Sequence, residues 1–279
     1  MQSTVNDYSW LDQHGHITGV SYMLPNNDQK VERLDLQHYM LRYTLKGNYL
    51  APVAEPACIL DVGSGTGRWL ANMAQEFPRA ELFGVDLRLP KEGKTAFPSN
   101  CHFQIGNVLE GLPFEDSSFN FIHQRLLIFA VPLLRWQHLV NELARVTAAE
   151  GWVELTEVNP FFHNMGPATK RMVDLIVRVS EQRGFDPFIS QHIGPLLTTA
   201  GLTNVKTSTH IIPLGDWGGQ LGTMAKTDVL AIPQAVKPLV VAQTQITPEE
   251  FDHLAMQMEQ EVEQYRTIFT FQIAYGQRQ

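Results

Sequence analysis

The apolar positions of this chain follow a helical period at its start and then alternate between strand-like and helix-like spacing. Between residues 29 and 49 they recur three and four positions apart, which predicts an amphipathic helix that ends near Gly47. Short apolar runs bounded by glycine or proline come next. They predict buried strands at 57–63, 80–87, 101–107, 119–128 and 151–158. Helical patterns at 68–77 and 135–147 lie between them.

Strands that are apolar on both faces and separated by helices are typical of a parallel sheet covered by helices. The pattern therefore predicts a doubly wound α/β fold. The last third of the chain predicts elements at 167–183 and 191–200 (helices), 204–215 (a strand), a further apolar helix, and 267–277 (a final strand). Thr247, Pro248 and Glu250 have the order of a helix N-terminus with a capping box. Since no repeat or low-complexity linker interrupts the chain, we expect one domain with elaborations.

Composition and charge exclude several classes of function. A net charge of −8 without a basic stripe argues against a nucleic-acid partner. Cys58 and Cys101 stand apart from any Cys/His cluster, so we expect neither a disulfide framework nor a metal site. The polar N-terminus has no secretory pattern, and no apolar run approaches a membrane span. We therefore expect a cytoplasmic protein with no membrane partner.

A glycine-rich loop follows the first predicted strand, and it carries the chemistry of the chain. Asp61-Val-Gly63-Ser-Gly65-Thr-Gly67 lies between a buried strand and a helix, where absent side chains and unpaired N–H groups suit a nucleotide-like ligand. A dinucleotide fingerprint would need a third glycine at position 68, which is Arg68. A P-loop would need a lysine followed by serine or threonine, which the loop lacks. Both of these readings fail.

The same loop closely resembles the first motif of class I S-adenosylmethionine-dependent methyltransferases. The resemblance implies a Rossmann-like seven-stranded methyltransferase sheet, with an N-terminal helical extension and helical insertions before the last strand. It implies S-adenosyl-L-methionine as cofactor and Asp86 as the acceptor for the ribose hydroxyls. Asn107 stands where the family more often has aspartate in the adenine loop. The cofactor-binding residues implied are Tyr22, Asp61, Gly63, Ser64, Gly65, Gly67, Asp86, Leu87, Asn107, Val108, Leu109, Gln124 and Arg125.

The flanking segments narrow the resemblance. Residues 22–52, "IIPLGDW" (211–217) and "AYGQRQ" (274–279) resemble the LaeA-like group, whose bacterial relatives modify small natural products. The chain is also similar to C-methyltransferases of the teleocidin pathway, which methylate a prenyl chain and trigger ring closure. The resemblance implies a small, largely apolar acceptor, with the prenyl chain of an indole alkaloid as one form. It leaves a second function open, because members of the group also act as regulatory partners of other proteins.

We expect the acceptor site at the carboxyl ends of the strands, beside the cofactor. The substrate-binding candidates are Tyr22, Asn159, Phe161, Phe162 and Trp217. His163 and His123 are candidates for catalysis, although His163 is also consistent with a packed or surface histidine and His123 with a residue that orients Arg125 or the cofactor. Arg125 either binds the methionine carboxylate or forms a structural ion pair.

The resemblance divides the chain into an N-terminal helical extension or lid (1–50) and a methyltransferase domain (51–279) with an acceptor-binding insertion at about 160–250. A long segment ahead of the core is able to pack on a neighbouring copy, so a homo-oligomer through the N-terminal helix is one expectation.

Overall fold

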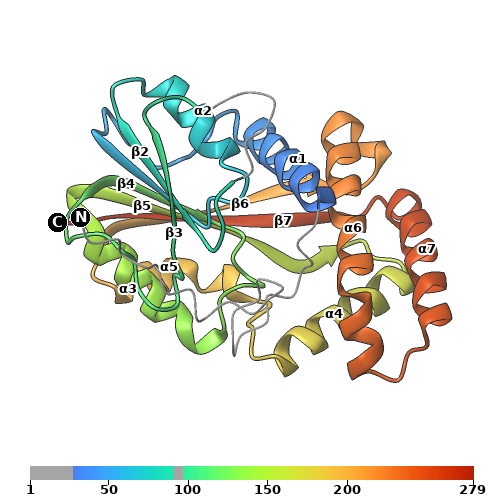
Figure 1. The fold of residues 1–279 in the computed structure, drawn as a ribbon. Coiled ribbons are helices and arrows are strands. Elements are labelled where there is room, and N and C mark those ends of the chain that lie inside the picture. The colour runs from blue at the N-terminus through green and yellow to red at the C-terminus, as the bar shows by residue number, and fades with distance from the viewer. Residues whose placement is uncertain (1–27, 91–96) are drawn as a thin grey trace.

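The computed structural model describes residues 28–90 and 97–279, and its centre is a seven-stranded sheet with the strand order β3-β2-β1-β4-β5-β7-β6 (Figure 1). The strands are β1 (Cys58–Val62), β2 (Glu81–Asp86), β3 (Cys101–Ile105), β4 (Phe119–Arg125), β5 (Thr147–His163), β6 (Thr203–Pro213) and β7 (Ile268–Gln277). Strands β1 to β5 pair in parallel, and β7 runs antiparallel to both of its neighbours. The doubly wound α/β prediction is confirmed, with β7 as the exception to parallel pairing.

Seven α-helices in the described part of the chain surround the sheet: α1 (Asp28–Leu45), α2 (Arg68–Glu76), α3 (Trp136–Val146), α4 (Pro167–Gln182), α5 (Ile193–Thr199), α6 (Gly219–Gln243) and α7 (Pro248–Gln264). Figure 1 shows α1 and α2 over one face of the sheet, α3 and α5 over the other, and α4, α6 and α7 gathered at one end. No helix within residues 28–90 and 97–279 is long and apolar enough to cross a bilayer.

The helices bury their apolar stripes in separate cores. Trp69 and Leu70 of α2 pack on β1 and β2, whereas Leu139 and Leu143 of α3 pack on the opposite face of the sheet. Met40 of α1 belongs to a third core, which it shares with α4, α6 and α7. The helix that precedes the sheet is therefore packed onto the helices inserted before the last strand.

The predicted capping box at the start of α7 is confirmed. Thr247 Oγ1 accepts a hydrogen bond from the Glu250 N–H at 3.2 Å, and the Glu250 carboxylate accepts one from the Thr247 N–H at 3.0 Å. These two bonds satisfy N–H groups that the first turn of a helix leaves without intrahelical partners.

Strand β5 is longer than the sequence predicts, and this changes the acceptor region. Pairing with β7 continues through Asn159 and resumes at His163, which lies opposite Ile268. The register shifts between Asn159 and His163, where Pro160 has no N–H to donate. Residues 159–163, which the sequence indicated as a segment after the strand, therefore extend the sheet.

Candidate cofactor and acceptor site

The glycine-rich loop connects β1 to α2 with a tight backbone. Gly63, Gly65 and Gly67 have φ angles of 75°, 54° and 70°, in the left-handed region. A Cβ atom on Gly63 would lie 2.7 Å from a Leu127 methyl carbon, and one on Gly67 would lie 2.8 Å from the Phe103 ring. A Cβ atom on Gly65 would have no contact closer than 3.5 Å. Gly65 is thus the loop glycine with open space beside it.

A cavity of about 190 Å³ lies beside the loop, at the carboxyl ends of β1, β2 and β4, and we name it the glycine-loop cavity. Ten predicted cofactor residues line it: Asp61, Gly63, Ser64, Gly65, Asp86, Leu87, Asn107, Val108, Leu109 and Arg125. Gly67 and Gln124 do not line it, because Gly67 packs against Phe103 and the Gln124 amide turns toward Glu157. Tyr22 lies outside the described residues.

Asp86, at the end of β2, binds the loop directly. Its Oδ2 accepts a hydrogen bond from the Gly65 N–H at 2.9 Å. Gly63 and Ser64 donate their N–H groups to the Val85 carbonyl one residue earlier, at 2.8 and 3.2 Å. The loop and the half-buried Asp86 carboxylate therefore form one unit at the edge of the cavity.

Asn107 shapes the next loop around the cavity. Its Oδ1 accepts a hydrogen bond from the Leu109 N–H at 3.0 Å, and its amide donates to Glu110 Oε1 at 3.0 Å. Both polar ends of Asn107 are thus used within its own loop. This geometry gives a physical reason for asparagine here, since an aspartate has no donor to offer Glu110.

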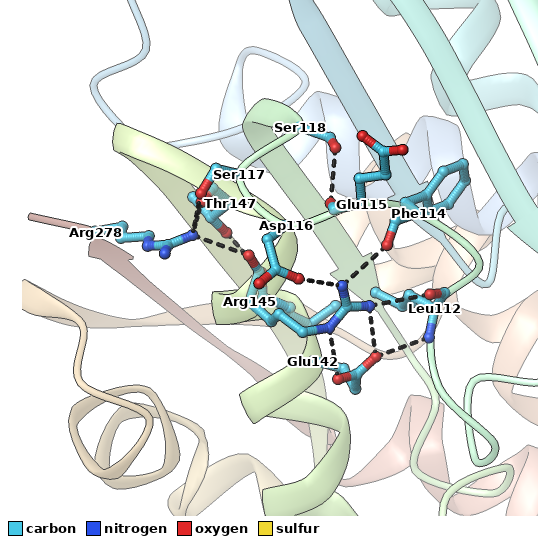
Figure 2. A network of polar contacts seen from close by, with 11 residues as sticks. Leu112, Phe114, Glu115, Asp116, Ser117, Ser118, Glu142, Arg145, Thr147 and Arg278 are labelled. Atoms are coloured by element: carbon cyan, nitrogen blue, oxygen red, sulfur yellow. Dashed lines mark hydrogen bonds and ion pairs between the residues drawn. The ribbon is translucent and has the colours of Figure 1, made fainter.

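The segment after Asn107 is anchored to α3 by a charged network (Figure 2). Arg145 donates to the carbonyl oxygens of Leu112 and Phe114 at 3.0 and 2.9 Å and to Asp116 Oδ1 at 2.7 Å. Glu142 accepts from the Leu112 N–H at 3.0 Å, and the hydrogen bonds from Arg145 hold the pKa of Glu142 below its ordinary value. The network holds residues 112–116 in place, directly after the loop residues that line the cavity.

His123 lies behind the cavity wall. Its Nδ1 is 2.8 Å from Asp61 Oδ1, and its ring stacks on Trp69 with centroids 3.9 Å apart. Burial lowers the pKa of His123. A carboxylate only accepts hydrogen bonds, so Nδ1 carries the proton that is donated to Asp61. The side chain does not line the glycine-loop cavity. This geometry favours the orienting role that the sequence left open over direct catalysis.

Arg125, the last residue of β4, lines the glycine-loop cavity. Burial lowers its pKa, while the charges of Asp61 and Asp35 act in the opposite direction. Among the described residues we find no hydrogen bond to this guanidinium. A guanidinium has five N–H groups, and one that donates to none of the described residues suits a ligand carboxylate.

Helix α1 forms a wall of the cavity that sequence reasoning missed. Arg33, Leu34 and Gln37 line the glycine-loop cavity. Asp35 accepts hydrogen bonds from Thr66 Oγ1 at 2.6 Å and from Arg68 Nη2 at 2.7 Å. The residue that replaces the third glycine of a dinucleotide fingerprint thus fixes α1 over the loop. An acidic residue within the predicted helix and a basic one at the loop are the signals that the sequence offered.

A second cavity, of about 100 Å³, adjoins the first, and we name it the apolar cavity. The two cavities share the lining residues Gln37, Leu126, Ile128, Phe129, Val158 and Ile232. Among the predicted acceptor residues, Phe162 lines the apolar cavity and packs 5.6 Å from the Phe269 ring.

The other described acceptor candidates line neither cavity. Phe161 is 48% exposed and stacks on Phe188 instead. The side chain of Asn159 accepts a hydrogen bond from the Phe161 N–H, and that of Trp217 donates to the Leu214 carbonyl. His163 is exposed at the end of the strand and lines neither cavity, so the structure gives no support for it as a base.

Glu157 holds the segment that the two cavities share. The buried carboxylate accepts hydrogen bonds from Gln124 Nε2 at 2.7 Å, from the Leu127 N–H at 2.8 Å and from the Ile128 N–H at 3.2 Å. Burial raises the pKa of Glu157 to about 7. Gln124, predicted to bind cofactor, thus donates to the carboxylate that also binds the backbone of Leu127 and Ile128.

Comparison with known proteins shows which family the chain belongs to. Residues 35–207 match a family model described as a methyltransferase domain. Methyltransferase str3 of Strobilurus tenacellus is 30% identical over 77% of this chain and 79% of its own. N-methyltransferase gliN of Aspergillus fumigatus is 26% identical over 92% of this chain and 96% of its own. The secondary metabolism regulator LAE1 of Cochliobolus heterostrophus is 28% identical over 73% and 69%.

The fold has solved counterparts. A phosphoethanolamine N-methyltransferase 2 from Haemonchus contortus, in complex with S-adenosylhomocysteine, superposes with a TM-score of 0.52 at 15% identity, covering 95% of this chain and 61% of that one. The residues around the glycine-loop cavity suit the cofactor, since they combine close backbone, carboxylates and an arginine without a hydrogen bond to the described residues. The chain belongs to the methyltransferase domain family and is an S-adenosyl-L-methionine-dependent methyltransferase.

Proposed function

We propose that this enzyme transfers the methyl group of S-adenosylmethionine to a small, largely apolar natural product held in the apolar cavity. One observation carries the proposal: a cavity lined almost wholly by apolar side chains adjoins the glycine-loop cavity and shares six lining residues with it. Acceptor and cofactor would then meet across the segment that contains Leu126, Ile128 and Phe129.

Residue roles on the cofactor side follow from the chemistry of the molecule. Asp86 would accept hydrogen bonds from the ribose hydroxyls, and Val108 and Leu109 would enclose the adenine. Arg125 would bind the methionine carboxylate, since it has no hydrogen bond to the described residues. The bound cofactor supplies an electrophilic methyl group on a sulfonium, and the carboxylates of Asp61 and Asp86 would favour that positive charge.

The chain itself would contribute position more than proton transfer. Methyl transfer is an in-line displacement, so the protein has to align the nucleophile and exclude water. No histidine lines either cavity within residues 28–90 and 97–279.

A finer proposal concerns the acceptor. The side chains of Phe129, Phe162, Phe269 and Phe271 line the apolar cavity. Aromatic faces stabilise a cation, which is what an alkene becomes when it takes up a methyl group. Together with the resemblance to teleocidin-pathway enzymes, this supports the prenyl chain of an indole alkaloid as the first acceptor to test.

Two further expectations stay proposals. Tyr39 and Tyr43 are 43% and 59% exposed on α1, which supports a homo-oligomer formed through the N-terminal helix. Light scattering on the purified chain measures this directly, and a monomer at all concentrations would contradict it. A cytoplasmic location is the other expectation.

The test of the proposed function begins with titration calorimetry against S-adenosylmethionine and S-adenosylhomocysteine. We expect micromolar binding of both, followed by the mass gain of one methyl group when prenylated indoles and other apolar aromatics are screened. Similarity to the regulator LAE1 supports a second candidate, a cofactor-binding regulator. Binding of a transcriptional partner without any methylated metabolite would favour that candidate.

A further inference from the structure

The wall between the cavities contains a buried acidic residue that the cofactor does not require. Asp228 of α6 is 2% exposed and lines the apolar cavity. Its Oδ1 lies 2.8 Å from Arg33 Nη1, and its Oδ2 accepts a hydrogen bond from Gln37 Nε2 at 3.0 Å. Both partners belong to α1. Burying an ion pair costs desolvation energy, and a hydrophobic pair of the same shape is often as stable. A contribution to folding stability is therefore a weak explanation for the presence of a buried charged pair at this place.

The carboxylate fixes the orientation of the Gln37 amide. Burial raises the pKa of Asp228, and the Arg33 guanidinium at Oδ1 acts in the opposite direction. Arg33 and Gln37 both donate to the carboxylate, one to each oxygen. In the structure the NH₂ group of Gln37 faces Asp228 Oδ2, which turns the carbonyl oxygen Oε1 the other way. Among the described residues we find no hydrogen bond to Oε1. Gln37 is also the polar member of the six residues that line both cavities.

The remaining polar group of the apolar cavity is already used. Ser180 donates its hydroxyl hydrogen to the Ile176 carbonyl of its own helix at 2.7 Å. Gln37 Oε1 is thus an oriented acceptor beside the point where the two ligands meet. Arg33 balances the charge of Asp228, so the pair gives no net attraction for a cationic amine. The sulfonium of the cofactor also disfavours a second positive charge there.

We propose that Gln37 Oε1 binds a neutral N–H or O–H group of the methyl acceptor, while the rest of the acceptor fills the apolar cavity. The inference rests on the proposed function, because it takes this cavity as the acceptor site. The proposal adds that the acceptor needs one neutral hydrogen-bond donor, so a fully apolar molecule of the same shape should bind more weakly. A buried site built to hydrogen-bond a donor discriminates strongly against analogues that lack it.

The experiment compares indole, the probe with one neutral N–H, and 1-methylindole, which lacks it. Binding of each to the protein saturated with S-adenosylhomocysteine is measured by ligand-observed NMR. We expect indole to bind the unmodified protein about three- to tenfold more tightly than 1-methylindole, as one net hydrogen bond predicts. Gln37→Met should remove that preference and leave the affinity for 1-methylindole unchanged. Gln75→Met, the same change on the exposed side of α2, is the matched control and should keep the preference.

Other results would overturn the proposal. Equal binding of the two probes by the unmodified protein, or binding of neither, contradicts the assigned acceptor. A Gln37→Met variant that weakens both probes equally would show that Gln37 only packs. Urea unfolding followed by tryptophan fluorescence checks that the variant is folded. If it is not, Asp228→Asn replaces it, and freeing the Gln37 amide to turn should reduce the preference for indole. Failure of the proposed function is seen separately, as loss of cofactor binding or of methyl transfer by the unmodified protein.

Discussion

Replacing Glu157 with glutamine tests the account of the segment that joins the two cavities. The carboxylate is 0% exposed and accepts three hydrogen bonds, two of them from the backbone of Leu127 and Ile128. A glutamine of the same shape offers one oxygen and one NH₂ group, so at least one of these donors would face another donor. The loss of one or two buried hydrogen bonds costs about 1–3 kcal/mol of folding free energy.

The dependence of this cost on pH gives the sharper test. Burial raises the pKa of Glu157 from the ordinary 4.5 to about 7. Between these values the folded protein keeps a proton that the unfolded chain has released, so the free energy of unfolding falls as the pH rises. From near pH 5 to near pH 8 the fall from this one group amounts to about 2–3 kcal/mol. Glu157→Gln removes that contribution, so the variant should lose correspondingly less stability over the same range.

Urea unfolding followed by tryptophan fluorescence near pH 5 and near pH 8 measures the difference. Burial also raises the pKa of Glu154 to about 7, but that group is present in both proteins and cancels from the comparison. Glu259→Gln on the exposed face of α7 is the matched control. Parallel stability profiles for Glu157→Gln and the unmodified protein would refute the reasoning, because they would mean that the three hydrogen bonds fully offset burial.

Three further predictions concern the glycine-loop cavity, each measured by calorimetry with S-adenosylhomocysteine. Gly65→Leu should abolish binding, because the side chain would occupy the space of the ligand. The chain should still fold, since a Cβ atom there meets no described atom closer than 3.5 Å and the left-handed φ of 54° costs about 1–2 kcal/mol. Unchanged affinity would mean that the ligand does not approach this loop. Asp86→Ala should weaken binding by about 1–3 kcal/mol through loss of a charged acceptor, whereas a loss of folding without selective loss of binding would make Asp86 structural. Arg125→Met should weaken binding by a similar amount, about 1–3 kcal/mol, if the guanidinium binds the carboxylate. Equal affinity of the variant and the unmodified protein would indicate that Arg125 has a structural role.

The sequence alone determined the features that depend on near neighbours. The alternation of strands and helices, the positive φ angles required of Gly63 and Gly65, and the capping box at Thr247 are local. Neighbouring residues set them through backbone sterics and short-range hydrogen bonds. The place of Asp86 beside the loop could also be predicted, because an acidic residue at the end of a strand lies at the carboxyl edge of a parallel sheet.

Only the tertiary structure decided what lies between the two ligands. Gln37 and Asp228 are 191 residues apart in the sequence and become partners when α1 packs on α6. The position of His163 depends on a similar contact, since β5 continues where β7, from the end of the chain, pairs with it beyond Pro160. Such contacts depend on how apolar faces of distant elements fit together, and the spacing of residues along one segment carries no information about its distant partner.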